Sequence, residues 1–136
     1  MLVVANEDNH PVNIAIHMVF VPLIYATSII LAALLPPIPL ASTIPPISIA
    51  DVSVAIYAIG YILLEPMAGL LMLPFHLGVM YFAHTLPTQF PREVIIKWAG
   101  ALNVSAWIAQ FLGHGLAEKR APALLDNLFQ VCHLST

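Results

Sequence analysis

The sequence predicts an all-α membrane protein with about four transmembrane helices, forming a single multi-span domain over residues 1–136. Charged residues make up only 8% of the chain and hydrophobic residues 60%, whereas soluble domains carry about 25% charged residues. No Asp, Glu, Lys or Arg occurs between Asp8 and Asp51, or between Glu65 and Arg92. Uncharged apolar runs of about 18 residues or more are typical of membrane spans. The expected partner of this apolar surface is the lipid bilayer.

The composition also excludes several classes of function. The net charge is −3 and there is no basic patch with interleaved aromatic residues, so a nucleic-acid partner is not expected. Cys132 is the only cysteine, which excludes an intramolecular disulfide and a cysteine-based zinc site. The N-terminal MLVVANEDNHP lacks the basic and apolar regions of a cleaved signal peptide, so we expect the first span to act as its own insertion signal.

Each predicted span is an apolar run bounded by proline or polar residues. The four spans are expected at residues 14–35, 49–64, 67–84 and 94–112. Pro22 would kink the first span, which membrane helices tolerate. The five prolines in PPIPLASTIPPIS predict a stiff loop after the first span. Pro66 suits the start of a helix after a tight turn. The stretch TLPTQFPRE predicts a second connection, and residues 122–134 predict a short amphipathic helix.

Four spans bring polar segments from distant parts of the sequence to one membrane face. The start of the first span, the turn at Glu65 and the end of the fourth span must lie on the same side, because successive spans alternate in direction. This places DNHPVNIAIH and QFLGHGLAEK together. Lys119 and Arg120 favour the cytosolic side under the positive-inside rule, whereas Arg92 and Lys97 would then flank the opposite side.

These two segments hold the residues that can carry chemistry. Asn13 and His17 are four residues apart and share one helix face, as do Gln110, His114 and Glu118. Ionisable groups that border spans usually face the interior of a bundle. One imidazole from each of two helices with a carboxylate is the ligand set of a 2-His-1-carboxylate iron site. The same groups would also suit zinc.

Structural roles remain open for the same residues. A histidine near a helix end is often an interfacial or hydrogen-bonded residue, and Glu118 beside Lys119 and Arg120 is also typical of a solvated helix end. For His76 and His84, which lie in and at the end of the third span, a structural role is the simpler interpretation.

Two blocks of the sequence carry a family resemblance. HPVNIAIHMVFVPL (10–23) and WIAQFLGHGLAEKRAPALLDNLFQ (107–130) resemble the signature blocks of the fungal and bacterial 2-hydroxy fatty acid dioxygenase family. YILLEPMAGLLMLP (61–74) is similar to the middle of that family. The resemblance implies an endoplasmic reticulum, multi-pass membrane enzyme that depends on Fe(II). Its reaction would remove one carbon from long-chain 2-hydroxy fatty acids by α-oxidation, a step in the breakdown of the sphingolipid base phytosphingosine.

The resemblance also implies roles for single residues. The histidines of the two family blocks fall on His17 and His114, the asparagine on Asn13 and the glutamate on Glu118. The family has another histidine five residues before the asparagine, where this chain has Asp8, which would offer an oxygen ligand instead.

The reaction would need O2 and no reducing cofactor, since a 2-hydroxy acid gives up four electrons on conversion to the shorter acid, CO2 and water. Lys119 or Arg120 would attract the substrate carboxylate. Gln110 and Asn13 would orient the metal ligands. Two alternatives remain: a zinc-dependent membrane lipid hydrolase with Glu118 as general base, and a non-enzymatic four-span lipid-binding or scaffold protein.

Overall fold

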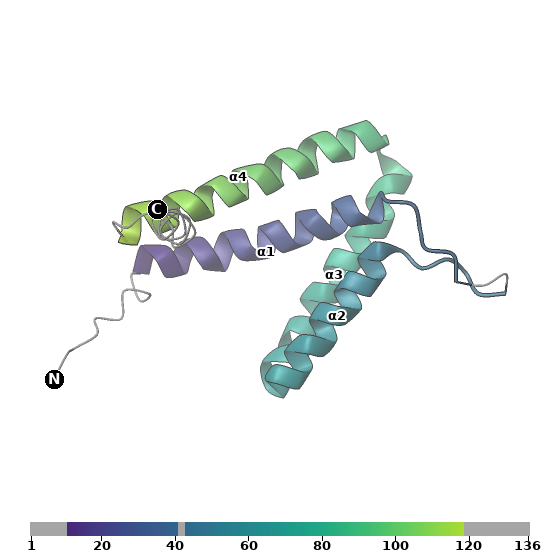
Figure 1. Cartoon of the computed structure of the whole chain (residues 1–136), viewed down its shortest axis with the longest axis horizontal. Coiled ribbons are helices and arrows are strands. Elements are labelled where there is room, and N and C mark those ends of the chain that lie inside the picture. The colour runs from purple at the N-terminus through teal and green to yellow at the C-terminus, as the bar shows by residue number, and fades with distance from the viewer. Residues whose placement is uncertain (1–10, 41–42, 119–136) are drawn as a thin grey trace, which may run out of the picture. The chain divides into compact units, whose positions relative to one another are not determined.

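The computed structural model describes the backbone of residues 11–40 and 43–118, with the side chains of residues 14–40 and 43–113. This part of the chain forms four helices (Figure 1). They are α1 (Pro11–Ala33), α2 (Ile49–Leu64), α3 (Pro66–Gln89) and α4 (Arg92–Glu118). The helices belong to two compact units, a terminal unit (Met1–Leu23 with Val104–Thr136) and a central unit (Ile24–Asn103). The single-domain assignment and the short helix expected at residues 122–134, which lies outside the described residues, stay predictions.

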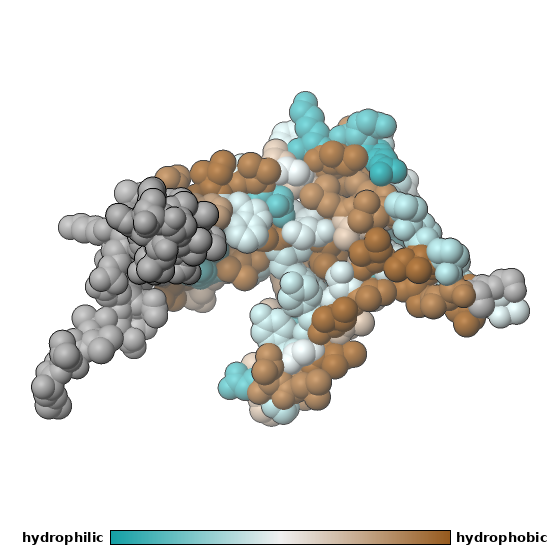
Figure 2. Space-filling view, in the orientation of Figure 1, coloured by the Kyte–Doolittle hydropathy of each residue, from teal (hydrophilic) through white to brown (hydrophobic). Residues whose placement is uncertain are grey.

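The all-α membrane class is confirmed. Three helices are long and apolar enough to cross a membrane, over Ile14–Ala33, Pro66–Gln89 and Arg92–Gly113. Large apolar side chains are exposed on them and on α2, among them Leu64 at 84% and Leu71 at 77%. Figure 2 shows this apolar surface along the helices. Because water would disfavour such a surface, the bilayer is its natural surrounding.

Helix α2 has the bounds that the sequence predicts, and its ends show why. Ser48 is the N-cap, and its hydroxyl oxygen accepts a hydrogen bond from the Ala50 amide at 3.2 Å. Asp51 lies in the first turn, where a negative charge favours the helix dipole. At the other end Glu65 caps both α2 and α3, and Pro66 begins α3. The tight turn predicted between the second and third spans is therefore confirmed.

The end of α3 differs from the sequence prediction. The third span was expected to end at residue 84, but the helix continues to Gln89. Pro87 lies inside this last stretch, yet the Thr85 and Thr88 hydroxyls donate hydrogen bonds to the carbonyls of Tyr81 and Thr85 at 2.9 and 2.7 Å. The carbonyl that Pro87 leaves without an amide donor is that of Ala83, four residues earlier, so these two bonds do not replace the lost one, and membrane helices tolerate such a proline through several local adjustments. The predicted connection TLPTQFPRE is therefore wrong for most of its length.

The other connection is the proline-rich loop after α1. The helix closes with two tight turns, in which the amides of Leu34 and Leu35 donate to the carbonyls of Leu31 and Ala32 at 3.1 Å each. Farther along, Ile38 and Ile47 pair in an antiparallel bridge through two backbone hydrogen bonds of 2.9 and 3.1 Å. This bridge fixes the two arms of the loop without a helix, as the prolines require.

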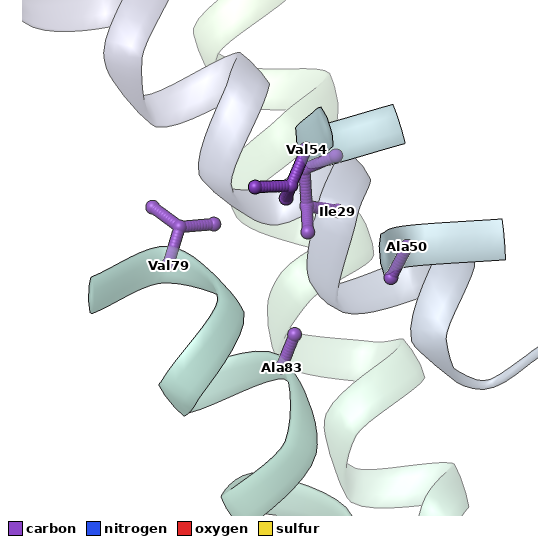
Figure 3. Packing of buried hydrophobic residues seen from close by; sticks show 5 residues of the cluster. All are labelled: Ile29, Ala50, Val54, Val79 and Ala83. Atoms are coloured by element: carbon purple, nitrogen blue, oxygen red, sulfur yellow. The ribbon is translucent and has the colours of Figure 1, made fainter. Parts of the chain in front are cut away.

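Small and β-branched residues form the core of the central unit. Ile29 of α1 packs with residues of α2 and α3 (Figure 3). The members from these two helices are Ala50, Val54, Val79 and Ala83. Small side chains let helix backbones approach closely, which drives packing in membranes where the hydrophobic effect between helices is weak.

Polar side chains also link the helices of the central unit. The Tyr25 hydroxyl lies 2.8 Å from Nδ1 of His76, a residue that is only 2% exposed. His84 Nε2 lies 2.6 Å from a carboxylate oxygen of Asp51 and so joins α3 to α2. Both histidines therefore have contacts that fit the structural roles favoured by the sequence.

The Tyr25–His76 contact gives a first prediction. Tyr25→Phe should lower the unfolding midpoint in detergent and destabilise the fold by about 1–3 kcal/mol, because the buried imidazole loses its partner. Nε2 of His76 already has no hydrogen-bond partner among the described residues. Tyr57→Phe is the matched control, since the Tyr57 ring is half exposed and meets Tyr25 edge to face at 5.1 Å. Equal midpoints for the two variants would contradict a stabilising role for the Tyr25 hydroxyl.

Candidate functional site

In the terminal unit, the start of α1 packs against the end of α4. Gly113 is buried, and a Cβ atom built on it would lie 2.7 Å from Cδ1 of Ile16 and 3.2 Å from its Cγ2. Figure 1 shows the start of α1 beside the end of α4. Segments from opposite ends of the sequence therefore meet, as predicted for two of the three polar segments. The position of the Glu65 turn relative to them stays a prediction.

The contact between Ile16 and Gly113 bears directly on the predicted metal ligands. His17 follows Ile16 on α1, and His114 follows Gly113 on α4. The two histidines therefore occupy adjoining register positions on facing helices. Asn13 lies one turn before His17, and Glu118 one turn after His114. Two imidazoles supplied from facing helices fit an iron or zinc ion.

The remaining ligands stay predictions. Among the residues whose side chains the structure describes, no group of three or more His, Cys, Asp or Glu is placed to hold a metal ion. The side chains of Asn13, His114 and Glu118 do not belong to that set, and His17 is half-buried. Asp8, Lys119 and Arg120 lie outside the described residues. The ligand set and the substrate contacts assigned to these residues are therefore untested.

One face of α4 is buried in the terminal unit. Its members are Ala106, Gln110 and Gly113, whose spacing of four and three residues puts them on the same side of the helix. Gln110 is the polar member and is only 6% exposed. Neither its amide oxygen nor its amide nitrogen has a hydrogen-bond partner among the described residues. Buried polar groups without partners are rare in native proteins, so this amide is a candidate group for binding a ligand.

Asn103 is a polar residue of α4 that sequence reasoning did not single out. Its amide nitrogen donates to the Ile24 carbonyl at 3.2 Å, to the Thr27 hydroxyl at 2.8 Å and to the Ser28 hydroxyl at 3.0 Å. These contacts fasten α4 to α1 within the central unit. An amide in the middle of an apolar span was the signal that could have revealed this link.

The central unit also contains an apolar cavity of about 280 Å³. Its wall has a single hydroxyl, that of Thr27, which donates to the Ile24 carbonyl and accepts from Asn103. The cavity therefore offers a ligand hydrocarbon contacts and little polar recognition. The lining residues are Thr27, Ile30, Leu86, Phe90, Val94, Ile95, Trp98, Ala99 and Leu102.

Comparison with known proteins places this sequence in a family. The profile described as 2-hydroxy-palmitic acid dioxygenase Mpo1-like matches residues 4–135, which is nearly the whole chain. The chain belongs to the Mpo1-like family. The match covers both histidine-bearing segments and the α2–α3 turn, so the predicted resemblance is confirmed.

A relative of the Mpo1-like chain is the 2-hydroxy-palmitic acid dioxygenase MPO1 of Saccharomyces cerevisiae. The two sequences are 32% identical over 123 residues, which cover 90% of this chain. The Mpo1-like chain spans 64% of the length of that relative. No solved structure matches the chain.

Proposed function

We propose that this chain is an Fe(II)-dependent dioxygenase that shortens long-chain 2-hydroxy fatty acids by one carbon. The observation that carries the proposal is the family match over residues 4–135. The packing of Gly113 against Ile16 supports it, because the two histidine-bearing helix turns belong to one compact unit. The reaction belongs to α-oxidation in the breakdown of phytosphingosine, and its proposed location is the endoplasmic reticulum membrane.

The proposed reaction balances with O2 as the oxidant. A 2-hydroxy acid and O2 give an acid one carbon shorter, CO2 and water. The bond between the carboxyl carbon and C2 breaks, and C2 becomes the new carboxyl carbon. The substrate loses four electrons, which is the number that O2 takes up. No further reductant is needed.

The predicted metal ligands, the two basic residues and Asn13 have roles in this scheme. His17 and His114 would hold the iron, with Glu118 or Asp8 as the carboxylate ligand. Bound Fe(II) supplies the redox chemistry that O2 requires. Lys119 or Arg120 would attract the substrate carboxylate, and Asn13 would orient the ligands by hydrogen bonding. The acyl chain would lie against the apolar helices or in the bilayer.

Product analysis tests the proposal. The chain, purified in detergent and loaded with Fe(II), should convert 2-hydroxypalmitate labelled at its carboxyl carbon into pentadecanoic acid and labelled CO2. O2 should be consumed in equal amount, and palmitate should give no product.

Two other results would contradict the proposal. Bound zinc with hydrolysis of a lipid in the absence of O2 would identify a lipid hydrolase with Glu118 as general base. A chain that binds no metal in a fixed ratio and consumes no O2 would instead be a lipid-binding or scaffold protein.

A further inference from the structure

The side-chain amide of Gln110 is buried without a hydrogen-bond partner among the described residues. Both of its polar atoms are covered, and neither forms a hydrogen bond with a described residue. A glutamine amide offers two N–H donors and an acceptor oxygen. Leaving these groups buried and unpaired costs free energy. The cost is offset when a ligand with complementary groups binds to them.

Asn103, on the same helix, carries an amide that does have hydrogen-bond partners. It lies seven residues before Gln110 and carries the same amide group. Its nitrogen has three oxygen acceptors on α1 within 3.2 Å. One amide of α4 is therefore used to fasten two helices. The contrast favours a role for the Gln110 amide in binding a ligand.

The location of Gln110 narrows the chemistry of that partner. Gln110 lies three residues before Gly113, the point of close approach to Ile16, and one helical turn before His114. A head group that lies beside the two predicted histidine ligands is therefore within reach of an amide on the same face of α4. A head group that binds these buried atoms must lose its own water. A ligand that leaves one of the atoms unpaired therefore binds much more weakly.

We propose that Gln110 binds the 2-hydroxyl and carboxylate groups of the substrate and thereby selects 2-hydroxy acids over unsubstituted fatty acids. The 2-hydroxyl donates to Oε1 of Gln110, and Nε2 of Gln110 donates to a carboxylate oxygen. An unsubstituted acid satisfies Nε2 but leaves Oε1 buried and unpaired. This inference rests on the proposed function for its substrate class, but it concerns binding and not turnover.

Binding measured without O2 tests the selection. The detergent-purified chain is equilibrated with radiolabelled 2-hydroxypalmitate or palmitate, and the two dissociation constants are compared. The unaltered chain should prefer the 2-hydroxy acid by about tenfold to a hundredfold, the range expected when one buried hydrogen-bonding group loses its partner. Gln110→Met, which keeps the length of the side chain and removes its hydrogen bonds, should bring the ratio near one, because the 2-hydroxy acid loses both of its hydrogen bonds to Gln110, whereas palmitate loses one and no longer leaves Oε1 buried and unpaired.

Asn103→Leu is the matched control. It removes an amide from the same helix and should lower the unfolding midpoint in detergent, because three hydrogen bonds are lost. The preference for 2-hydroxypalmitate should survive in this variant. A purely structural role for Gln110 would make both variants behave alike, with a lower midpoint and an unchanged preference.

The outcomes separate this inference from the proposed function. The inference is overturned if the unaltered chain shows no preference, if Gln110→Met keeps it, or if that variant loses affinity for both acids equally. A Gln110-dependent preference without release of pentadecanoic acid would support the inference and refute the dioxygenase. Release of pentadecanoic acid, together with a binding preference that is unchanged in Gln110→Met, would support the dioxygenase and refute the inference.

Discussion

Replacing either His17 or His114 by alanine is expected to abolish iron binding and the turnover of 2-hydroxypalmitate. Each residue would supply one of about three protein ligands of the metal. The packing of Ile16 against Gly113 leaves the two histidines at adjoining positions on facing helices. Loss of groups that merely support a ligand costs about 10–100-fold in affinity or activity, so loss of a ligand should exceed that range.

The measurement is the iron content per chain after anaerobic reconstitution with Fe(II), followed by the rate of product formation. His84→Ala is the control, because its ring is held by Asp51 in the central unit and has no part in the proposed site. It should retain iron and activity. Full iron occupancy in both His17→Ala and His114→Ala would show that the ligand assignment is wrong.

Gly69→Ala should have the largest effect on stability. A Cβ atom on Gly69 would lie 2.5 Å from the backbone nitrogen and 2.6 Å from Cα of Ile62 on α2. Backbone atoms cannot swing aside as the end of a side chain can, so α2 and α3 must separate. We expect a loss at or above the upper end of the roughly 1–3 kcal/mol that overpacking costs, measured as a lower unfolding midpoint in detergent.

Gly78→Ala on the same helix is the control for this effect. No atom lies within 4 Å of a Cβ built on Gly78, so alanine there should be neutral or slightly stabilising. The pair separates the steric effect from the change in helix propensity, which is the same at both positions. Similar midpoints for Gly69→Ala and Gly78→Ala would refute the close approach of α2 and α3.

The sequence was sufficient for the fold class because long uncharged runs have few alternatives to membrane helices. It also predicted both ends of α2, where Ser48 and Pro66 act locally. It failed at the end of α3, because proline usually ends a helix in water, whereas Pro87 is accommodated inside this one. Local sequence signals thus predicted the helices, but they placed the end of α3 too early because a membrane helix can continue through proline.

The candidate site was predictable only to the level of helix faces. The spacing of Gln110 and His114 indicates a shared face, but it cannot show whether an amide finds a partner. That depends on which residues of α1 lie opposite the amide. Asn103 donates to the Thr27 hydroxyl, whereas Gln110 has no hydrogen-bond partner among the described residues. The close approach at Gly113 likewise depends on tertiary packing.

The unequal lengths of α2 and α3 have a consequence for the surrounding lipid. With 16 and 24 residues, the two arms of this hairpin measure about 24 and 36 Å at ~1.5 Å per residue. A bilayer that α2 crosses upright must be thin, and α3 must then tilt, kink or extend beyond the hydrocarbon. Hydrophobic thickness differs among membranes, from about 27 Å in the endoplasmic reticulum to about 32–33 Å at the cell surface. We therefore expect the short arm to match a thinner bilayer better than a thicker one.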